Sequence, residues 1–363
     1  VRLRGSQMTY ELTIEPLGET IEVEEDQNLL DAALRAGIWL PHACCHGLCA
    51  TCKVQVVDGE VEIGDASPFA LMDFEREEGL ALACCATAQS DLVIEADIDE
   101  DPDAVVRPVQ DYEGTVTELS DLTPTAKGLF IELDGEGLEF QAGQYVNLEL
   151  PGIDQPRAFS MANGPAETGV LELNIRHVPG GEATTYIHEQ LKTGDRVKLT
   201  GPYGRFFVRK SAPEHLLLLA GGTGLSSIKS MLIDVLEDES QQDKNVTLVY
   251  GARDRGELYY HDLLGELAAR HERFTYVPAL SEAREEDAWE GATGFVHDVA
   301  SAHFDGDFRG HKAYMCGPPV MIDACITALM RGRLFERDMY MERFYSAADA
   351  SQNIRKSPLF KSI

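Results

Sequence analysis

Hydrophobic and polar positions follow three different patterns along the chain. Short alternating runs with one helical stretch occupy residues 8–103, alternating runs separated by turn residues occupy 109–210, and apolar strands alternate with helical stretches over 213–346. The acidic run Asp97–Pro108 contains two prolines and is typical of a linker. We therefore predict three domains. Val1–Gln7 is interpreted as an expression remnant and is left out of the fold prediction, and 347–363 is interpreted as a polar, poorly ordered tail.

The first segment is predicted to form a compact α+β domain. Apolar residues at helical spacing predict a helix over Leu29–Ala36, ended by Gly37. Asp58-Gly59 lies between two strand-like runs and predicts a hairpin, and Ser67-Pro68 opens a second helix-like stretch. The strand-like runs are Tyr10–Ile14, Thr20–Val23, Lys53–Val57, Glu60–Ile63 and Leu92–Ile98.

The second and third segments predict an antiparallel β-barrel and a doubly wound α/β domain. The strand-like runs of the second are Gly114–Leu119, Leu129–Leu133, Tyr145–Leu150, Val170–His177 and Arg196–Thr200. In the third, the continuous apolar run Leu216–Ala220 is typical of a buried parallel strand, and the helix-like run Ser226–Glu237 follows it. Further strands are predicted at Val246–Tyr250, Phe274–Pro278 and Ala313–Cys316, and further helices at Leu263–Arg270 and Met321–Met330. This alternation is typical of a nucleotide-binding fold.

Charge and cysteine content exclude some classes of function and favour others. The net charge is −31, and the 23 acidic and 3 basic residues of 8–103 contribute −20 of it. Nucleic acid and anionic membranes would be repelled, and no apolar run is long enough for a transmembrane helix. The acidic segment fits either a solubilising surface or a docking face for a basic partner. No signal peptide opens the chain, and eight cysteines in 363 residues indicate a reducing cytoplasm and a metal cluster.

Four cysteines have the spacing of an iron–sulfur site. Three follow the pattern C-x4-C-x2-C in one loop, and a fourth lies far downstream, as in plant-type [2Fe-2S] domains. Small loop residues such as Gly47 would let backbone amides approach the sulfurs. The candidate ligands are Cys44, Cys49, Cys52 and Cys84.

Two other metal sites fit less well. Structural zinc usually needs two closely spaced cysteine pairs, and only Cys49–Cys52 forms one. A Rieske centre needs histidine ligands, and Cys44-x-His46 supplies half of such a motif. The spacing favours Cys44 over the adjacent Cys45, whereas spacing alone leaves Cys84 and Cys85 open.

Three turns indicate flavin chemistry in the barrel segment. Arg157-Ala-Phe159-Ser160 offers a phosphate clamp, a ring and a hydroxyl for a flavin N5. Gly180-Gly181-Glu-Ala-Thr184 opens a helix, whose free amides would suit a pyrophosphate. Gly201-Pro-Tyr-Gly204 is a further turn. Each of these turns alone is common in proteins that bind no flavin, and only the presence of all three in this order favours a flavin site.

Two strand ends in the third segment indicate a nicotinamide nucleotide. Ala220-Gly-Gly-Thr-Gly224 joins a buried strand to a helix, where glycines allow a phosphate to approach the backbone. Cys316-Gly-Pro-Pro319 ends a later strand at the same edge. Cys316 is either a thiol beside the nicotinamide or a buried apolar residue, and for Cys325 the second interpretation is favoured.

These motifs together resemble the ferredoxin–NADP reductase superfamily with a fused plant-type ferredoxin domain. The likeness to the reductases of phenol hydroxylases, which are soluble di-iron monooxygenases, extends over nearly all of Met8–Ile363. It is carried by strings such as WLPHACCHGLCATCKVQVVDGEVEIGDASPFALMDFERE, QAGQYVNLELPGID, FDGDFRGHKAYMCGPPVMID and GRLFERDMYMERFYSAAD. The resemblance implies a β-grasp ferredoxin domain at 8–103, an FAD-binding barrel at 109–210 and an NAD-binding domain at 213–346.

The resemblance also assigns roles to individual residues. It implies that Cys84 rather than Cys85 completes the iron ligands, and that Glu342-x-Phe344 is the acidic–x–aromatic ending whose ring covers the flavin. Phe159 stands where the family has tyrosine, and Ser227 where proline is common. The implied flavin contacts are Arg157, Phe159, Ser160, Arg176, Gly181, Thr184 and Phe344, the nicotinamide contacts are Gly221, Gly222, Thr223, Gly224 and Gly317, and the catalytic residues are Ser160, Cys316 and Glu342.

The resulting hypothesis is an electron-transfer reductase. Electrons would pass from NADH to FAD, then singly to the [2Fe-2S] cluster and to the oxygenase component of a phenol or aromatic monooxygenase. Asp254 would repel the 2′-phosphate of NADPH, whereas Arg253 and Arg255 could attract it, and the resemblance favours NADH. The near alternative is a reductase of a ring-hydroxylating dioxygenase, and the distant one is a non-enzymatic metal-binding scaffold.

Overall fold

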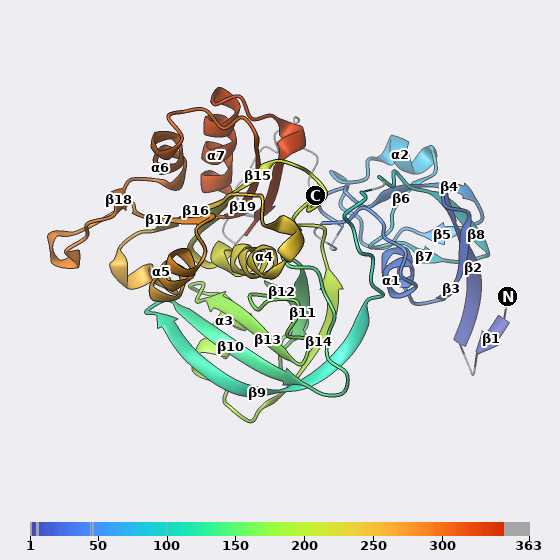
Figure 1. Cartoon of the computed structure of the whole chain (residues 1–363). Helices are drawn as coiled ribbons and strands as arrows, with labels where there is room; N and C mark the ends of the chain where they lie inside the picture. Colours follow the sequence, from blue (N-terminus) through green and yellow to red (C-terminus); the bar gives the residue numbers. More distant parts are fainter. Residues whose placement is uncertain (1, 5–6, 44, 46, 100, 345–363) are drawn as a thin grey trace. The chain divides into compact units, whose positions relative to one another are not determined.

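The computed structural model describes residues 2–4, 7–43, 45, 47–99 and 101–344. They form two units with separate sheets, of which the first ends at Gln110 and the second begins at Asp111 (Figure 1). None of the helices in the described ranges has both the length and the apolar character needed to cross a membrane. The tail predicted at 347–363 lies outside the described residues.

A mixed sheet and a buried helix build the first unit. Its strands are β1 (Arg2–Arg4), β2 (Gln7–Glu15), β3 (Glu19–Glu24), β4 (Lys53–Asp58), β6 (Leu80–Leu82) and β8 (Leu92–Glu95). They follow the order β1-β2-β8-β4-β6, with β3 paired to β2, and β2 runs parallel to β8. Helix α1 (Leu29–Arg35) begins after Asn28, whose side chain accepts a hydrogen bond from the Asp31 N–H, and it buries Leu29 and Leu30.

The hairpin predicted at Asp58-Gly59 is wrong. β6 pairs with one edge of β4 and β8 with the other, so no edge remains for the strand that follows the turn. That strand, β5 (Val61–Glu62), pairs instead with β7 (Thr87–Ala88) in a separate ribbon. Gly59 has a φ of 93°, and a Cβ at this position would lie 2.3 Å from the Asp91 carbonyl oxygen. The turn therefore packs against the entry to β8.

The helix predicted from Ser67-Pro68 begins later than expected. The Ser67 carbonyl accepts hydrogen bonds from the N–H groups of Ala70 and Leu71, which closes one turn only. Met72 is then extended, with a ψ of 156°, and α2 runs from Asp73 to Glu77. An extended residue cannot continue the helical hydrogen bonds, so the stretch splits in two.

The segment set aside as an expression remnant contributes a strand. Arg2–Arg4 form β1 and pair antiparallel with the start of β2, with Leu3 opposite Met8. Val1 and residues 5 and 6 lie outside the described part of the chain. Arg2–Arg4 and Gln7 therefore belong to this sheet, and the interpretation of Val1–Gln7 as an expression remnant stays a prediction.

The barrel predicted for the second segment is present in the second unit. Its strands are β9 (Gln110–Thr123), β10 (Ala126–Leu133), β11 (Tyr145–Glu149), β12 (Arg157–Ser160), β13 (Val170–Arg176) and β14 (Arg196–Tyr203). Their order is β12-β11-β14-β9-β10-β13, and a bridge between Met161 and Leu173 brings the two ends of this path together. Leu129, Leu148 and Leu171 belong to the interior cluster. Helix α3 (Glu182–Glu189) follows β13.

A parallel sheet forms the rest of the second unit. Its strands are β15 (His215–Gly221), β16 (Val246–Ala252), β17 (Phe274–Leu280), β18 (Ala292–Thr293), β19 (His311–Gly317) and β20 (Met339–Arg343), in the order β18-β17-β16-β15-β19-β20. The helices are α4 (Leu225–Glu237), α5 (His261–Arg270), α6 (Val296–His303) and α7 (Pro319–Arg331). The sequence pattern did not predict α6, β18 or the edge strand β20.

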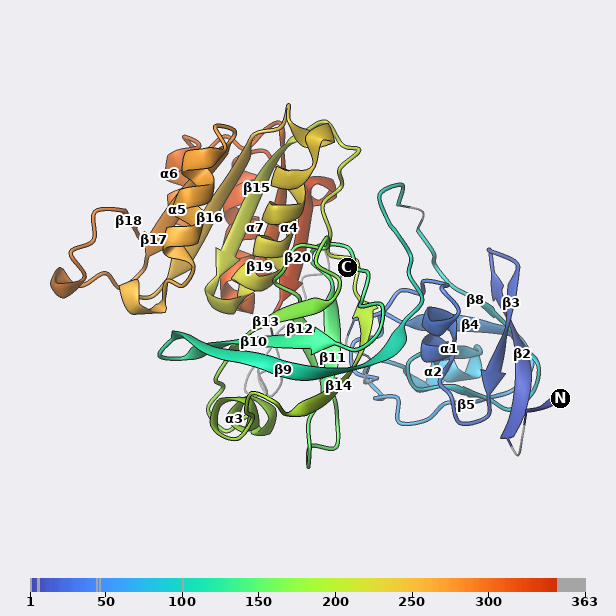
Figure 2. The ribbon, with the colours of Figure 1, turned by 60° about the horizontal axis from the view of Figure 1, so that its bottom comes forward.

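Helices cover both faces of this sheet (Figure 2). Leu216 and Leu218 pack in a cluster with residues of α4 and α5. Leu217 and Leu219 pack in the other cluster, with residues of α6 and α7. Both faces of the sheet are therefore covered, as the continuous apolar run of β15 predicted.

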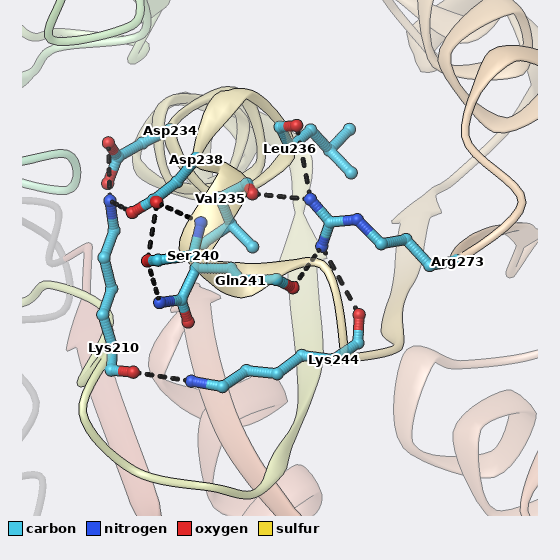
Figure 3. A network of polar contacts seen from close by, with 9 residues as sticks. All are labelled: Lys210, Asp234, Val235, Leu236, Asp238, Ser240, Gln241, Lys244 and Arg273. Carbon is cyan, nitrogen blue, oxygen red and sulfur yellow. Dashed lines mark hydrogen bonds and ion pairs between the residues drawn. The ribbon is translucent and has the colours of Figure 1, made fainter.

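A polar network fixes the carboxyl end of α4 (Figure 3). Nζ of Lys210 lies 3.0 Å from Asp234 Oδ1 and 2.8 Å from Asp238 Oδ2. The hydrogen bond from Lys210 lowers the pKa of Asp238 to about 2. Arg273 donates to backbone carbonyls at the end of the helix and just beyond it, those of Val235, Leu236, Gln241 and Lys244. Arg273 thus satisfies helix carbonyls, and both cations oppose the negative end of the helix dipole.

Candidate functional site

Cysteines from two loops of the first unit meet beside β4. Cys49 and Cys52 precede β4, and Cys84 and Cys85 follow β6. Pairing of these strands, with Lys53 opposite Leu82, brings the two loops together, and the Ala83 N–H donates to the Cys52 carbonyl at 2.9 Å. The thiols of Cys52 and Cys84 share a hydrogen bond, and Sγ of Cys84 lies 3.6 Å from that of Cys85.

The surroundings of Cys84 favour its thiolate form. The hydrogen bond from Cys52 and the backbone N–H of Gly47 outweigh burial and lower the pKa of Cys84 to about 6. Gly47 has a φ of 70°, and a Cβ there would lie 2.7 Å from Cys85 Sγ. The Gly47 amide thus approaches a sulfur closely, as predicted, and this position requires glycine. Thiolates are the form in which cysteines bind metals.

The described cysteines offer donors suited to an iron–sulfur cluster. Sulfur donors with a backbone N–H at one sulfur are what such clusters use. Among the described residues, no group of three or more His, Cys, Asp or Glu side chains is placed to hold one metal ion. Cys84 is buried and its thiol is hydrogen-bonded to that of Cys52, whereas burial raises the pKa of Cys85 to about 12. Cys44 and His46 lie outside the described residues.

In the second unit, three side chains from distant parts of the chain converge on one carboxylate oxygen. Oε2 of Glu342, on β20, accepts hydrogen bonds from Ser160 Oγ at 3.2 Å and from Ser227 Oγ at 2.8 Å. Sγ of Cys316 lies 3.7 Å from the same oxygen. Ser160 ends β12 of the barrel, and Cys316 lies opposite Glu342 in the β19–β20 pair. The three residues predicted to be catalytic are therefore neighbours, and Ser227 joins them.

Burial shifts the titration of this group. Removal from water raises the pKa of Glu342, and the hydrogen bonds from Ser227, Ser160 and Cys316 oppose that rise. Burial, with the nearby Glu342 charge, raises the pKa of Cys316 well above its ordinary value. Cys316 belongs to the hydrophobic cluster that includes Leu225 and also contacts two polar groups. The thiol is therefore buried, and its place beside the nicotinamide stays a prediction.

The glycine-rich turn after β15 lies against two neighbouring strands. Gly222–Gly224 form the 3-10 turn η1, and a Cβ at Gly224 would lie 2.1 Å from the Cys316 carbonyl oxygen. A Cβ at Gly221 would lie 2.4 Å from Met321 Sδ. The Ser226 hydroxyl donates to the Thr223 carbonyl at 2.9 Å, which fixes the turn. Its glycines are needed for close packing as well as for any phosphate.

The other predicted flavin residues lie on the barrel and on α3. Arg157 Nη1 donates to the Gln155 carbonyl at 2.6 Å, and Arg176 is exposed. Gly181 precedes α3, and Thr184 Oγ1 accepts from the Val178 N–H at 3.1 Å. The side chain of Phe159 is partly buried against the barrel cluster, and that of Phe344 against the α4 side of the sheet.

An ion pair that the sequence pattern did not reveal joins the barrel to α4. Nζ of Lys229 and Oε2 of Glu172 form a salt bridge in which both side chains are buried, and Tyr260 Oη donates to Glu172 Oε1 at 2.7 Å. Lys229 also lies over the Tyr260 ring, 4.6 Å from its centroid. The one available signal was a lysine inside the apolar stretch Ser226–Glu237.

Comparison with known families assigns a domain type to each sheet. The 2Fe-2S iron-sulfur cluster binding domain matches residues 12–89, the oxidoreductase FAD-binding domain matches 114–208, and the oxidoreductase NAD-binding domain matches 218–326. These ranges contain Cys49, Ser160 and Cys316, respectively. The predicted order of ferredoxin-type, FAD-binding and NAD-binding domains is confirmed.

Two relatives match this arrangement from end to end. The reductase component of phenol 2-monooxygenase from Pseudomonas sp. strain CF600 is 61% identical over 356 residues, 98% of this chain and 100% of that protein. The phenol hydroxylase P5 protein of Acinetobacter pittii strain PHEA-2 is 56% identical with the same coverage. This chain belongs to the family of phenol hydroxylase reductase components. Members of this reductase family are NADH-dependent iron–sulfur flavoproteins, and this chain transfers electrons from NADH via FAD and a 2Fe-2S centre.

Solved structures of other reductases have the same architecture as this reductase. A cytochrome P450 reductase from Amycolatopsis has a TM-score of 0.84 and 35% identity, covering 93% of this chain and 99% of that one. A ferredoxin reductase in carbazole 1,9a-dioxygenase has a TM-score of 0.76 and 28% identity, covering 94% and 100%. The fold is thus shared by reductases whose names give different oxygenases.

Proposed function

We propose that this reductase oxidises NADH at a flavin beside Ser160, Cys316 and Glu342 and delivers single electrons to the oxygenase component of a phenol hydroxylase. The observation that carries the proposal is the convergence of these side chains on Glu342 Oε2, because it joins the FAD-binding barrel to the NAD-binding sheet at one point. FAD would convert a hydride into single electrons, and a [2Fe-2S] cluster would carry them onward.

Ser160 and Glu342 would hold and move the proton at the flavin edge. The hydroxyl of Ser160 donates a hydrogen bond to Glu342. With flavin bound, this hydroxyl could donate to a flavin nitrogen instead of to Glu342. Cys316 would limit how closely the nicotinamide approaches, because its strand ends at the η1 turn. Phe344 would cover the ring from the end of β20, since its N–H bonds the Gly317 carbonyl at 3.0 Å.

The remaining cofactor contacts are proposed from two glycine-containing turns. Backbone amides at Gly221–Gly224 would bind the nicotinamide nucleotide and those at the start of α3 the flavin pyrophosphate. The full flavin set is Arg157, Phe159, Ser160, Arg176, Gly181, Thr184 and Phe344, and the nicotinamide set is Gly221, Gly222, Thr223, Gly224 and Gly317.

The neighbourhood of Asp254 suits NADH better than NADPH. Arg253 pairs with Glu257 at 3.6 Å, and Arg255 donates to the Asp287 carbonyl at 3.0 Å. Both guanidinium groups are thus engaged by protein oxygens, and Asp254, which pairs with Arg284 at 3.5 Å, would itself repel a 2′-phosphate.

The iron ligands are proposed to be Cys44, Cys49, Cys52 and Cys84. The contact of Cys52 with Cys84 and the Gly47 amide support this set. The oxygenase that receives the electrons is proposed to be a di-iron enzyme, on the 61% identity to the phenol 2-monooxygenase reductase component. The net charge of −31 supports a protein partner over nucleic acid or an anionic membrane. We place the reductase in a reducing cytoplasm, where such thiolates persist.

Reconstitution tests the proposed partner. The purified reductase should contain iron, sulfide and flavin, and with NADH and a phenol hydroxylase oxygenase component it should support formation of catechol from phenol. A ring-hydroxylating dioxygenase component serves as the matched control. Turnover with the dioxygenase but with no di-iron oxygenase would contradict the proposed partner. A colourless protein would contradict the redox function altogether.

A further inference from the structure

The amide of Asn174 has no partner among the described residues although it is buried. Asn174 lies on β13 and is 6% exposed, and neither its Oδ1 nor its Nδ2 has a hydrogen-bond partner there. A buried carboxamide left in this state costs stability, so it is normally paired. By contrast, Asn163, which is 3% exposed, donates to the carbonyls of Glu167 and Val170 and accepts from the Glu172 N–H.

The position of Asn174 places its side chain beside the predicted flavin residue Ser160. Met161 and Leu173 form an antiparallel bridge. Ser160 precedes Met161 and Asn174 follows Leu173, so Ser160 lies opposite Asn174. Residues directly opposite each other project from the same face of a sheet. Leu173 belongs to the barrel interior, so its neighbour Asn174 projects outward.

The same outward face leads to the nicotinamide turn. Glu172, two residues before Asn174, binds Lys229 of α4 and Tyr260 of the NAD-binding domain. Strand β13 also contacts the η1 turn at Gly222–Gly224. On the neighbouring strand β10, the residue opposite Asn174 is Gly128, which has no side chain. The amide therefore lies between Ser160 and the NAD-binding domain with no side chain opposite it on β10.

We propose that Asn174 is a flavin-positioning residue whose carboxamide hydrogen-bonds the polar edge of the isoalloxazine ring. The inference rests on the proposed flavin site at Ser160. A carboxamide offers one acceptor oxygen and two N–H donors, and the pyrimidine edge of a flavin presents an N–H donor flanked by carbonyl acceptors. The two groups are complementary, and the barrel leaves the amide unpaired so that it can serve the ring.

Substitution to leucine separates this role from a structural one. Asn174→Leu keeps the branching and the number of side-chain heavy atoms and removes both polar groups, and Asn163→Leu is the matched control. Flavin would be removed from the reductase with its iron retained, and FAD titrated back by fluorescence. We expect Asn174→Leu to bind FAD about tenfold more weakly, equivalent to about 1.4 kcal/mol. Its flavin reduction potential should become more negative, with iron content unchanged.

Stability of the flavin-free protein is the second readout. Asn174→Leu should be as stable as the wild type or more stable, because no protein hydrogen bond is lost, whereas Asn163→Leu should be less stable. A loss of stability with unchanged FAD affinity and potential would overturn the proposal in favour of a structural amide. A change in NADH affinity alone would overturn it in favour of a nicotinamide contact. A wild-type chain unable to rebind FAD would instead overturn the proposed function.

Discussion

The hydroxyl of Ser227, on α4, donates a 2.8 Å hydrogen bond to Oε2 of Glu342, on β20. Ser227 is fully buried, and its hydrogen bond is the strongest of the influences that hold down the pKa of Glu342 against burial. It stands where the resembling reductases commonly have proline, which could not make this bond. Ser227 thus tunes the titration of Glu342.

Ser227→Ala should raise the pKa of Glu342 further, because a donor to its charged form is lost. We expect the pH dependence of flavin reduction by NADH, measured by stopped flow, to move to higher pH. Ser226→Ala is the matched control, since the Ser226 hydroxyl bonds the Thr223 carbonyl instead. An identical shift in both variants would show that Glu342 is not the group that titrates.

The salt bridge between Lys229 and Glu172 should be essential for joining the barrel to α4. Each side chain is less than a tenth exposed, so removing one partner leaves a buried charge unpaired. Lys229→Met or Glu172→Gln alone should lower the free energy of unfolding by about 3–5 kcal/mol, measured by urea denaturation. The double variant should lose less than the sum of the two. Additive losses would mean that the two charges are not coupled.

The elements that build the site follow from local patterns, whereas their contacts do not. The apolar run of β15, the glycine turn and α4 were all predicted, because each is set by residues close in sequence. The hairpin at Asp58-Gly59 was wrong because turn chemistry is local, while the occupation of both edges of β4 is decided by β6 and β8.

The grouping of the site residues shows the same limit. The motif resemblance selected Ser160, Cys316 and Glu342, but no pattern could show that they share one oxygen, since up to 182 residues separate them. Asn174 and Glu172 carry no motif at all. A polar residue in a strand is ordinary until the structure shows that it is buried and what faces it.

Cys49→Ser should abolish the iron–sulfur centre without abolishing flavin reduction. Its thiolate is one of the proposed iron ligands, and the FAD- and NAD-binding domains lie in the other unit. We expect loss of iron, sulfide and cluster absorbance between about 400 and 550 nm, while NADH still bleaches the flavin. Cys85→Ser, at the edge of the group, should keep its iron. Full iron in Cys49→Ser, or loss in Cys85→Ser, would contradict the ligand set.

Cys316→Ala should slow flavin reduction by NADH while leaving iron content unchanged. The thiol is fully buried and contacts both Ser227 and Glu342 at the NAD-binding strand end. Cys325→Ala is the matched control, because Cys325 is a buried thiol of α7 in the opposite cluster. Rapid-mixing rates should fall only for Cys316→Ala. Unaltered kinetics would leave the buried-thiol interpretation alone.

Glu342→Gln should remove the pH dependence that this carboxyl imposes on stability. Burial raises its pKa above the ordinary value of 4.5, so the folded chain holds a proton that the unfolded chain releases. The stability it contributes is therefore complete below that value and declines as the pH rises through the folded-state pKa. Glutamine keeps an acceptor for Ser227 and Ser160 and cannot ionise. The urea midpoint of the flavin-free variant, relative to wild type, should increase from pH 5 to pH 8, and a constant difference would show that Glu342 is ionised throughout that range.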